Sequence, residues 1–546
     1  MSREQETGPL LHEDNRTEQA PRKDMDSQQN LLNDLEFGLT DITQDPFVEV
    51  PQGRHLGVFS TMVLFVARIV GSGIFATPSS IYVNCGGNTG IYFGVWSLAG
   101  LVSFAGLFVF LEYGSWLPRS GGRKNFLEQT YTRPKLMMSV VFVCFTVISG
   151  FAMSNAIVFG KYFLYVLGFS DPSTGVQSNA SKYASIIVIL VAMLVHGYSV
   201  RSGVRIQNFL GGIKFGLIGL MCLIGVYSFF YRVSEGEELP SLKSNPVFTY
   251  QNKSDVSLSS LASAFLNAFF CFSGWDSVHS VASEVKNPTR TLKVGGTASL
   301  LICFTCYSMM NLAYVNVLSY EEIKQAGPLV GSVLFTKLFG KVLGSKLLSL
   351  SVAVSTLSNL LVVIYGLSRM NQESFREGYL PFSKQLASNW PWGSPLPSIL
   401  VCGGLTIIWL AVLPPENSSF DYLVSMEGYG NQFFLLLIAA GLFIHRGRHK
   451  GQRPSTRAST LGTILMIAVS GYTLVTPFIG DQSRNIIGFL PPYQITSILL
   501  IGACFLFWLV KFVISPRTFH YVLEPHVSYL ADGLAVTEWT KKNYDR

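Results

Sequence analysis

The sequence predicts an all-α polytopic membrane protein with twelve transmembrane helices. Of its 546 residues, 49% are hydrophobic and only 13% are charged, which is too little charge to cover the surface of a soluble globule of this size. Apolar windows of about 20 residues, enough to cross roughly 30 Å of hydrocarbon, recur along nearly the whole chain after residue 55. This recurrence excludes a soluble domain with a single anchor.

The twelve predicted spans are the windows 56–82, 88–112, 136–160, 183–200, 206–230, 260–285, 297–318, 347–368, 396–413, 422–444, 459–478 and 492–514. An even number of spans places both termini on one side of the membrane. Lysine and arginine gather in the loops 113–135, 201–205 and 445–458, whereas the loops 83–87 and 414–421 carry none. The positive-inside rule therefore predicts cytosolic termini. These loops also account for the net charge of +7 without a nucleic-acid partner.

The windows divide the chain into five segments. We expect a disordered cytosolic tail (1–54), a first repeat of five helices (55–230), a second repeat (231–445) with an outside loop at 231–258, helices 11 and 12 (446–515) and a cytosolic C-terminal tail (516–546). Within the first tail, residues 33–50 mix acidic and apolar side chains. That stretch is either a docking segment for a cytosolic trafficking regulator or a solvated linker.

The first window contains helix breakers near mid-membrane. In "RIVGSGIFATP", Gly71-Ser72-Gly73 falls 15 residues after the start of the window, or roughly 20 Å along a helix. Each unpaired backbone group in hydrocarbon costs several kcal/mol, so a break survives where a polar ligand satisfies it. The free N–H groups after the break suit a carboxylate.

The sixth window contains a second break. In "NAFFCFSGWDSVHSVASEV", Ser273-Gly274 lies in mid-window, with Asp276 close behind. Windows one and six open the two repeats, so the breaks correspond, as expected of a 5+5 inverted-repeat transporter with discontinuous helices 1 and 6. Freed carbonyls facing freed amides fit the ammonium and carboxylate of an α-amino acid. The alternative is that the small residues only permit close helix packing.

Three segments carry a family resemblance. "GSGIF" (71–75), "SGWDSVHSVASEVKNPTRTLK" (273–293) and "SRMNQESFREGYLP" (368–381) resemble the L-type branch of the amino acid-polyamine-organocation transporter superfamily. The resemblance covers roughly residues 55–515. Within that superfamily, "SGGRKNFLE" (120–128), "STLSNLLVVIYGLSR" (355–369) and "REGYLPFS" (376–383) resemble the fungal methionine permeases more than the animal exchangers.

The resemblance implies uptake of methionine, or of other neutral or sulfur-containing amino acids, across the plasma membrane. It implies a substrate site made of Ile69, Gly71, Ser72, Gly73, Phe270, Ser273 and Gly274. The amides of Ser72 and Gly73 would meet the carboxylate, and the carbonyls of Ile69, Phe270 and Ser273 the ammonium. The Phe270 ring would be a gate over the ligand, unless it is only a packing aromatic.

Two basic residues inside windows are candidates for ion coupling. Arg68 departs from the small residue usual in L-type transporters, and an arginine at this depth needs a cavity or an acid, such as Asp276 or Glu112. It either occupies the place of a sodium ion or forms a structural ion pair alone. Lys214, in "GGIKFGLIGL", matches a lysine that stands in for sodium in proton-coupled relatives. A buried lysine suits this role because it can change charge during a transport cycle. Its alternative is a side chain that snorkels to the cytosolic face.

Asn155 and Asn359 lie in windows three and eight. Each is either a pocket residue or an interhelical hydrogen-bonding residue. The sequence contains no repeated channel filter and none of the His or Ser motifs of membrane enzymes. We therefore expect no enzyme, cofactor or metal site.

Proton symport is the expected mechanism. The alternatives are an exchanger or facilitator of broad neutral specificity, and a transporter-like nutrient receptor. The loop 161–182 has no cysteine, so no covalent heavy-chain partner is expected.

Overall fold

The computed structural model describes residues 57–543 except 117–121, 151, 170–178, 231–246, 254–255, 277–284, 415–416, 450–453, 480–489 and 532. The predicted N-terminal tail and most of the predicted outside loop at 231–258 therefore lie outside the described residues.

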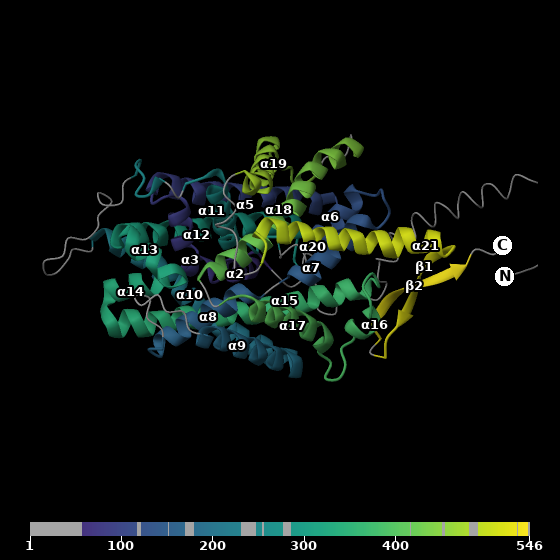
Figure 1. Cartoon of the computed structure of the whole chain (residues 1–546), viewed down its shortest axis with the longest axis horizontal. Coiled ribbons are helices and arrows are strands. Elements are labelled where there is room, and N and C mark those ends of the chain that lie inside the picture. The colour runs from purple at the N-terminus through teal and green to yellow at the C-terminus, as the bar shows by residue number, and fades with distance from the viewer. Residues whose placement is uncertain are drawn as a thin grey trace, which may run out of the picture. The chain divides into compact units, whose positions relative to one another are not determined.

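Long apolar helices dominate this part of the chain (Figure 1). Among the described residues, ten helices are long and apolar enough to cross a membrane, and two shorter apolar helices coincide with windows six and nine. The prediction of an all-α polytopic membrane protein is confirmed. The count of twelve crossings and the inverted relation between the repeats remain predictions.

The spans follow the predicted order. They are α2 (Val58–Ile69) with α3 (Gly73–Ala76) and α4 (Pro78–Asn84), α5 (Thr89–Trp116), α7 (Met137–Ser149) with α8 (Met153–Val166), α9 (Asn179–Tyr198), α10 (Val200–Phe230), α11 (Leu258–Cys271), α12 (Pro288–Val317), α15 (Ser349–Arg376), α17 (Leu396–Val412), α18 (Asn417–Arg448), α19 (Thr460–Val475) and α20 (Tyr493–Trp508). Between them lie α6 (Arg123–Thr130), α13 (Tyr320–Ala326), η4 (Gly327–Leu329), α14 (Val330–Gly340), the π-helix η5 (Lys341–Leu348), α16 (Ser383–Leu386) and η6 (Thr476–Phe478). The π-helix η8 (Leu509–Ile514) and α21 (Ser515–Thr518) extend α20.

Two details differ from the predicted spans. The expected basic loop at 201–205 is helical, because α10 begins at Val200 and only Ser199 separates it from α9. The third span is interrupted, since α7 ends at Ser149 and Gly150 is extended, with φ −75° and ψ 93°. The sequence analysis expected continuous helix at that position.

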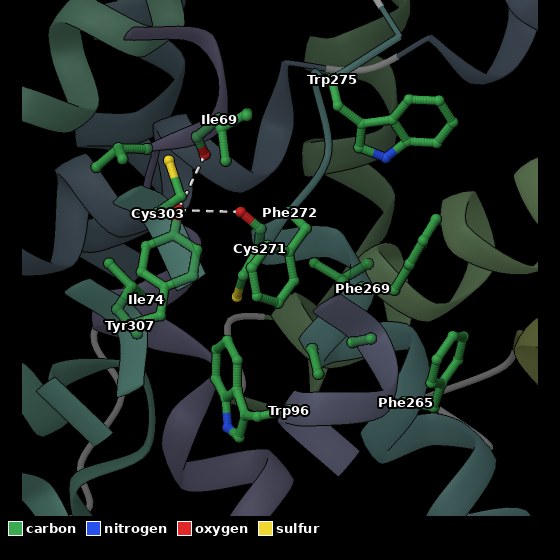
Figure 2. Close-up of a cluster of buried hydrophobic side chains, with 14 of the residues drawn as sticks. Ile69, Ile74, Trp96, Phe265, Phe269, Cys271, Phe272, Trp275, Cys303 and Tyr307 are labelled. Atoms are coloured by element: carbon green, nitrogen blue, oxygen red, sulfur yellow. Dashed lines mark hydrogen bonds between the residues drawn. The ribbon is translucent and has the colours of Figure 1, made fainter. Parts of the chain in front are cut away.

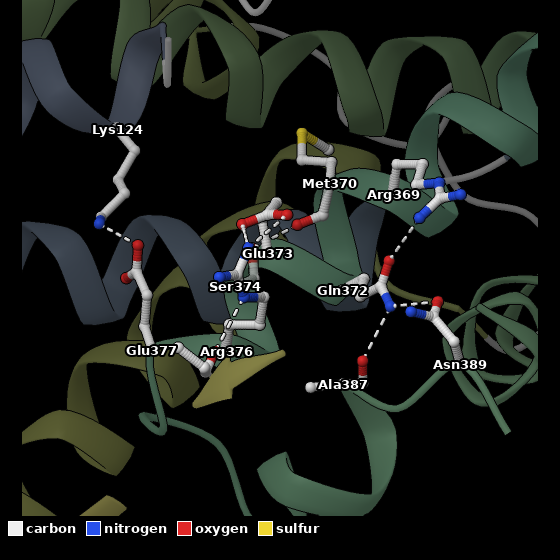
Figure 3. Close-up of polar contacts among 11 residues, drawn as sticks. Lys124, Arg369, Met370, Gln372, Glu373, Ser374, Arg376, Glu377, Ala387 and Asn389 are labelled. Atoms are coloured by element: carbon white, nitrogen blue, oxygen red, sulfur yellow. Dashed lines mark hydrogen bonds and ion pairs between the residues drawn. The ribbon is translucent and has the colours of Figure 1, made fainter. Parts of the chain in front are cut away.

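The C-terminal tail contains a β-hairpin, which the sequence analysis did not expect. Strands β1 (Tyr521–Tyr529) and β2 (Ala535–Asn543) pair antiparallel. The hairpin docks on the end of α15, where Arg376 and Glu377 lie (Figure 3): Arg376 Nε donates to the Ala535 carbonyl at 3.0 Å, and Trp539 Nε1 donates to the Glu377 carbonyl at 3.0 Å.

A further ion pair joins the hairpin to α16. The Nζ atom of Lys384 lies 2.9 Å from Oε1 of Glu538. Hydrogen bonds from Lys384 and then Ser528 hold the pKa of Glu538 below its usual value, so this contact is present at neutral pH. The tail therefore ends in a structured element that contacts the α15–α16 connection.

Glu112, a candidate counter-ion of Arg68, is instead paired with Arg446. Its Oε1 atom accepts from Arg446 Nε at 2.7 Å, and its Oε2 atom accepts from Arg446 Nη2 at 2.5 Å and from the Ala458 amide at 2.6 Å. The Glu112 side chain is fully buried. These contacts join α5 to the end of α18, so Glu112 acts as a structural residue in this conformation.

We predict that Glu112→Gln destabilises the protein strongly. Removing one charge of a buried pair leaves the other uncompensated, which costs about 3–5 kcal/mol. The apparent melting temperature of the detergent-purified protein should fall by several degrees. Glu524→Gln is the matched control, because its pair with Lys542 is half exposed and worth little; equal melting temperatures for the two variants would contradict the prediction.

Candidate functional site

The helix of the first span is interrupted at Val70–Ser72, as the glycines in the sequence lead us to expect. The last helical hydrogen bond of α2 runs from the Val70 amide to the Val66 carbonyl at 2.9 Å. Val70 is extended, with φ −75° and ψ 102°, and α3 begins only at Gly73. Three peptide units therefore leave the helical pattern inside an apolar span.

Side chains from other helices satisfy the carbonyls around this break. Lys214 Nζ of α10 donates to the Ala67 carbonyl at 2.8 Å. Three buried tyrosine hydroxyls do the same further along: Tyr307 to Ile69 (3.2 Å), Tyr314 to Ile74 (3.2 Å) and Tyr162 to Phe75 (3.1 Å). The acceptors of the broken segment are thus held by α8, α10 and α12.

The amides of the break are not satisfied in the same way. Within the described residues, the N–H groups of Gly71, Ser72 and Gly73 have no hydrogen-bond acceptor, and neither does the buried Ser72 hydroxyl. All three residues are buried. The break therefore presents several donors in a buried setting, which suits an anionic ligand group.

The sixth span is also broken, directly against the first. Helix α11 ends at Cys271, and Gly274 has φ +112°, a conformation that favours glycine. A Cβ at Gly274 would lie 2.8 Å from Cγ of Arg68, and one at Gly73 would lie 2.8 Å from Sγ of Cys271. Glycines thus bring the two breaks into backbone contact; residues 277–284, the rest of the predicted sixth span, lie outside the described residues.

One hydroxyl bridges the two breaks. Tyr307 donates to the Ile69 carbonyl of the first span and lies 3.0 Å from the Cys271 carbonyl of the sixth (Figure 2). Its ring packs in an aromatic cluster with Trp96 and Phe272, with ring centroids 6.0 and 5.3 Å away. The bridge is therefore held in place by close packing.

Asn155, Asn359 and Lys214 form one buried chain of hydrogen bonds beside the first break. Lys214 Nζ donates to Oδ1 of Asn359 at 3.3 Å, and Nδ2 of Asn359 donates to Oδ1 of Asn155 at 3.1 Å. A Cβ added at Gly71 would lie only 2.5 Å from Nδ2 of Asn359. The two asparagines therefore bond between helices and also line the broken segment, and Lys214 points inward.

Arg68 lies between the first, sixth and eighth spans. Its Nη1 atom donates to the Val362 carbonyl at 3.3 Å, and Gly366 leaves room for the guanidinium, because a Cβ there would lie 3.3 Å from Nη1. Asp276 and Glu427 are the acids whose charges act on it. Of the two predicted counter-ions, Asp276 acts on Arg68 through its charge, but it forms an ion pair with another arginine.

The arginine that pairs with Asp276 is Arg123 of α6. Its Nε atom lies 2.7 Å from Oδ2 of Asp276, and its Nη1 atom donates to Oδ1 of Asn431 at 3.0 Å. The charge of Arg123 also acts on Glu427. Arg123 thus joins α6 to spans six and ten, and the charge of Arg68 acts on Glu427 as well.

The predicted gate and its neighbours lie at the end of α11. Phe270 is half-buried, and its carbonyl accepts from the Ser273 amide at 3.0 Å. Ser273 is exposed, in contrast to the buried Ser72. Of the carbonyls expected to meet the substrate ammonium, that of Ile69 accepts from one internal donor, Tyr307, and so has a second lone pair available. The Phe270 carbonyl accepts from the amides of both Phe272 and Ser273.

The sequence analysis missed the three tyrosines, Arg123 and Glu427. Glu427 carries a usable signal, since it is an acid inside an apolar window. Arg123 lies in a basic loop with nothing local to mark it. The tyrosines lie within apolar spans, where their hydroxyls have no signature until the spans are packed.

The comparison with known protein families decides the identity of the chain. The model of the family described as amino acid permease matches residues 56–504. The chain belongs to the amino acid permease family. The match spans both breaks and the residues around them, and it confirms the family predicted from the sequence.

Named relatives of this permease are transporters. It is 59% identical over 496 residues to the low-affinity methionine permease of Saccharomyces cerevisiae, covering 91% of this chain and 89% of that protein. The high-affinity methionine permease of the same yeast is 27% identical over 506 residues, covering 90% and 84%. The serine/threonine exchanger of Bacillus subtilis is 25% identical over 424 residues, covering 77% and 89%.

We predict that Gly71→Ala abolishes most transport by the permease. The added methyl group would displace the Asn359 amide and with it the partner of Lys214, and overpacking of this kind costs about 1–3 kcal/mol. Because the cost falls on the arrangement of the break itself, initial uptake of labelled methionine, corrected for the amount of protein at the cell surface, should fall about fivefold or more, since about 1.4 kcal/mol is a factor of ten.

Gly219→Ala is the control. Gly219 lies in α10 with open space around its Cα, so an added methyl group meets nothing. Uptake by this variant should match the parent protein. Unchanged uptake by Gly71→Ala would mean that the close approach of the first break to Asn359 is dispensable.

Proposed function

We propose that the permease imports methionine across the plasma membrane by proton symport with alternating access. The observation that carries the proposal is the meeting of two broken spans, with unpaired buried amides at Gly71–Gly73 on one side and carbonyls on the other. Such a site fits the carboxylate and ammonium of an α-amino acid. The match with this chain covers at least 84% of the length of each of the two yeast methionine permeases, which supports methionine as the substrate.

The substrate backbone has a defined set of partners in this proposal. The amides of Ser72 and Gly73, with Gly71 allowing close approach, receive the carboxylate. The second lone pair of the Ile69 carbonyl, together with the carbonyls of Phe270 and of Ser273 beside Gly274, accepts from the ammonium. The ring of Phe270 closes over the ligand as a gate.

Lys214 is the proposed proton carrier. Its ammonium donates to the Ala67 carbonyl and to Asn359, both neutral groups, in the interior of a membrane span. A charge in this position has no counter-charge among its hydrogen-bond partners, so its protonation can differ between states of the cycle. Deprotonation would weaken the hold of α10 on the end of α2.

Arg68 takes the place of a sodium ion in this scheme. Its guanidinium supplies a fixed positive charge beside the breaks, balanced by Asp276 and Glu427. A permanent cation bound to the chain removes the need for a dissociable one. We therefore propose that transport is independent of sodium.

The remaining assignments follow from the family and the loop charges. Both termini face the cytosol, where the first 54 residues offer a docking segment to a trafficking regulator. The permease works as a single chain without a covalent heavy-chain partner, cofactor or metal, and it performs no chemical conversion of its substrate. An exchanger is the second candidate, because one relative is a serine/threonine exchanger.

Uptake into cells that lack other methionine transporters tests the function. We expect labelled methionine to accumulate, unlabelled methionine to compete better than serine, lysine or glutamate, and a protonophore to abolish accumulation. Uptake that survives the protonophore and requires an internal amino acid would identify the exchanger. No saturable uptake of any amino acid by surface-expressed protein would refute the proposal.

Proteoliposomes test the role of Lys214. A gradient of one pH unit is worth about 1.4 kcal/mol, which supports at most about tenfold accumulation for one proton. Lys182 is the control: it lies near the start of α9, and its ammonium donates to the Ala411 and Leu413 carbonyls at the end of α17, away from the breaks. We expect the parent protein and Lys182→Gln to accumulate methionine, and Lys214→Gln only to equilibrate it. Replacing sodium with choline should change nothing. Accumulation by Lys214→Gln would exclude it as the carrier, and a sodium requirement would exclude the proposed role of Arg68.

A further inference from the structure

A cavity lies between the end of the twelfth span and the C-terminal hairpin. Its volume is about 330 Å³. Its lining residues are Phe507, Val510, Lys511 and Ser515 from the helical side and Tyr521, Leu523, Trp539 and Lys541 from the hairpin. Among the described residues two ammonium groups line it and no carboxylate does, so this part of the chain gives it a positive charge.

The cavity uses one face of the hairpin. Leu523 pairs with Lys541 and Tyr521 pairs with Asn543 in the antiparallel register, and side chains alternate between the two faces of a strand. Lys542 therefore points to the opposite face, where its Nζ atom lies 3.1 Å from Oε1 of Glu524. One face carries an uncompensated lysine and the other a neutralised one.

The two lysines of the cavity are held in place. Lys511 Nζ donates to the carbonyls of Gly378 (3.3 Å) and Tyr379 (2.7 Å), and it lies 5.3 Å from the Phe512 ring centroid. Lys541 lies over the Tyr521 ring, 4.8 Å from its centroid. Neither ammonium group has a carboxylate partner in the part of the chain that the structure describes, and each retains N–H capacity for an anion.

The apolar wall of the cavity continues into the surface that faces lipid. The span Tyr493–Thr518 is only 17% buried over its apolar window, the lowest value among the described spans. Leu506, Val510 and Ile514 on this helix are each about half exposed (57, 44 and 45%). A ligand with acyl chains along this surface would bring its headgroup to the two lysines.

We propose that this cavity binds the headgroup phosphate of an anionic phospholipid. With the termini in the cytosol, as the loop charges predict, the cavity faces the leaflet that carries anionic lipid. A free phosphate would satisfy the lysines but would leave Phe507 and Val510 without a partner, so the apolar wall favours a lipid. Because the hairpin forms half of the site, bound lipid fastens the hairpin to the twelfth span.

Native mass spectrometry of the detergent-purified full chain tests this proposal. We expect phosphatidylserine to bind more tightly than phosphatidylcholine. A lysine near an anionic headgroup is worth about 1 kcal/mol, or about fivefold in affinity, so Lys541→Gln and Lys511→Met should each weaken phosphatidylserine binding about fivefold. Lys542→Gln, on the opposite face, is the matched control and should bind as the parent does.

Three outcomes would overturn the proposal. They are equal affinity for the two lipids, an equal loss in Lys541→Gln and Lys542→Gln, and displacement of phosphatidylserine by millimolar inorganic phosphate, which would indicate a free-phosphate site. Retained methionine uptake by Lys541→Gln shows that the variant is folded. The lipid site can therefore fail while the proposed transport function stands, and the reverse also holds.

Discussion

The structure depends on how backbone groups released inside a membrane are satisfied. The first and sixth spans lose their helical pattern part-way along their length, and in hydrocarbon each orphaned peptide group is costly. At the first break, the carbonyls receive donors from α8, α10 and α12, namely one lysine and three tyrosines. The amides at Gly71–Gly73 receive no acceptor from the described chain. The carbonyls are thus bonded within the protein, and the amides remain available for a ligand, as the proposed function requires.

The same division explains why glycine stands at particular positions. Gly73 faces Cys271 and Gly274 faces Arg68 at distances that admit no side chain, so the two breaks meet through their backbones. Gly71 lies equally close to Asn359. Lys214, the asparagine pair and the unpaired amides are thereby brought within one set of contacts. Under the proposed function, a proton at one end of that set and an amino acid at the other would both act on the same few peptide units.

The sequence predicts the breaks well because they are local. Gly71-Ser72-Gly73 and Ser273-Gly274 interrupt apolar windows. Few membrane architectures tolerate a broken helix inside the hydrocarbon region, because the freed peptide groups need partners. The donors to the carbonyls of the first break are not local. Nothing in the sequence distinguishes Tyr162, Tyr307 and Tyr314 from other residues of apolar spans until the packed helices direct their hydroxyls inward. The choice among counter-ions was open for the same reason, since Glu112 meets Arg446 from a distant helix. The C-terminal hairpin was not predicted, because it docks on the end of α15, which is distant from it in the sequence.

Tyr307 has one hydroxyl hydrogen and two carbonyl neighbours, Ile69 at 3.2 Å and Cys271 at 3.0 Å. A phenol can donate to only one acceptor at full strength, so the two discontinuous helices share a single donor while they stay together. If either helix tilted away, the hydroxyl could turn wholly to the carbonyl that remains. Separation of the two helices at this point would therefore forfeit less than one complete hydrogen bond.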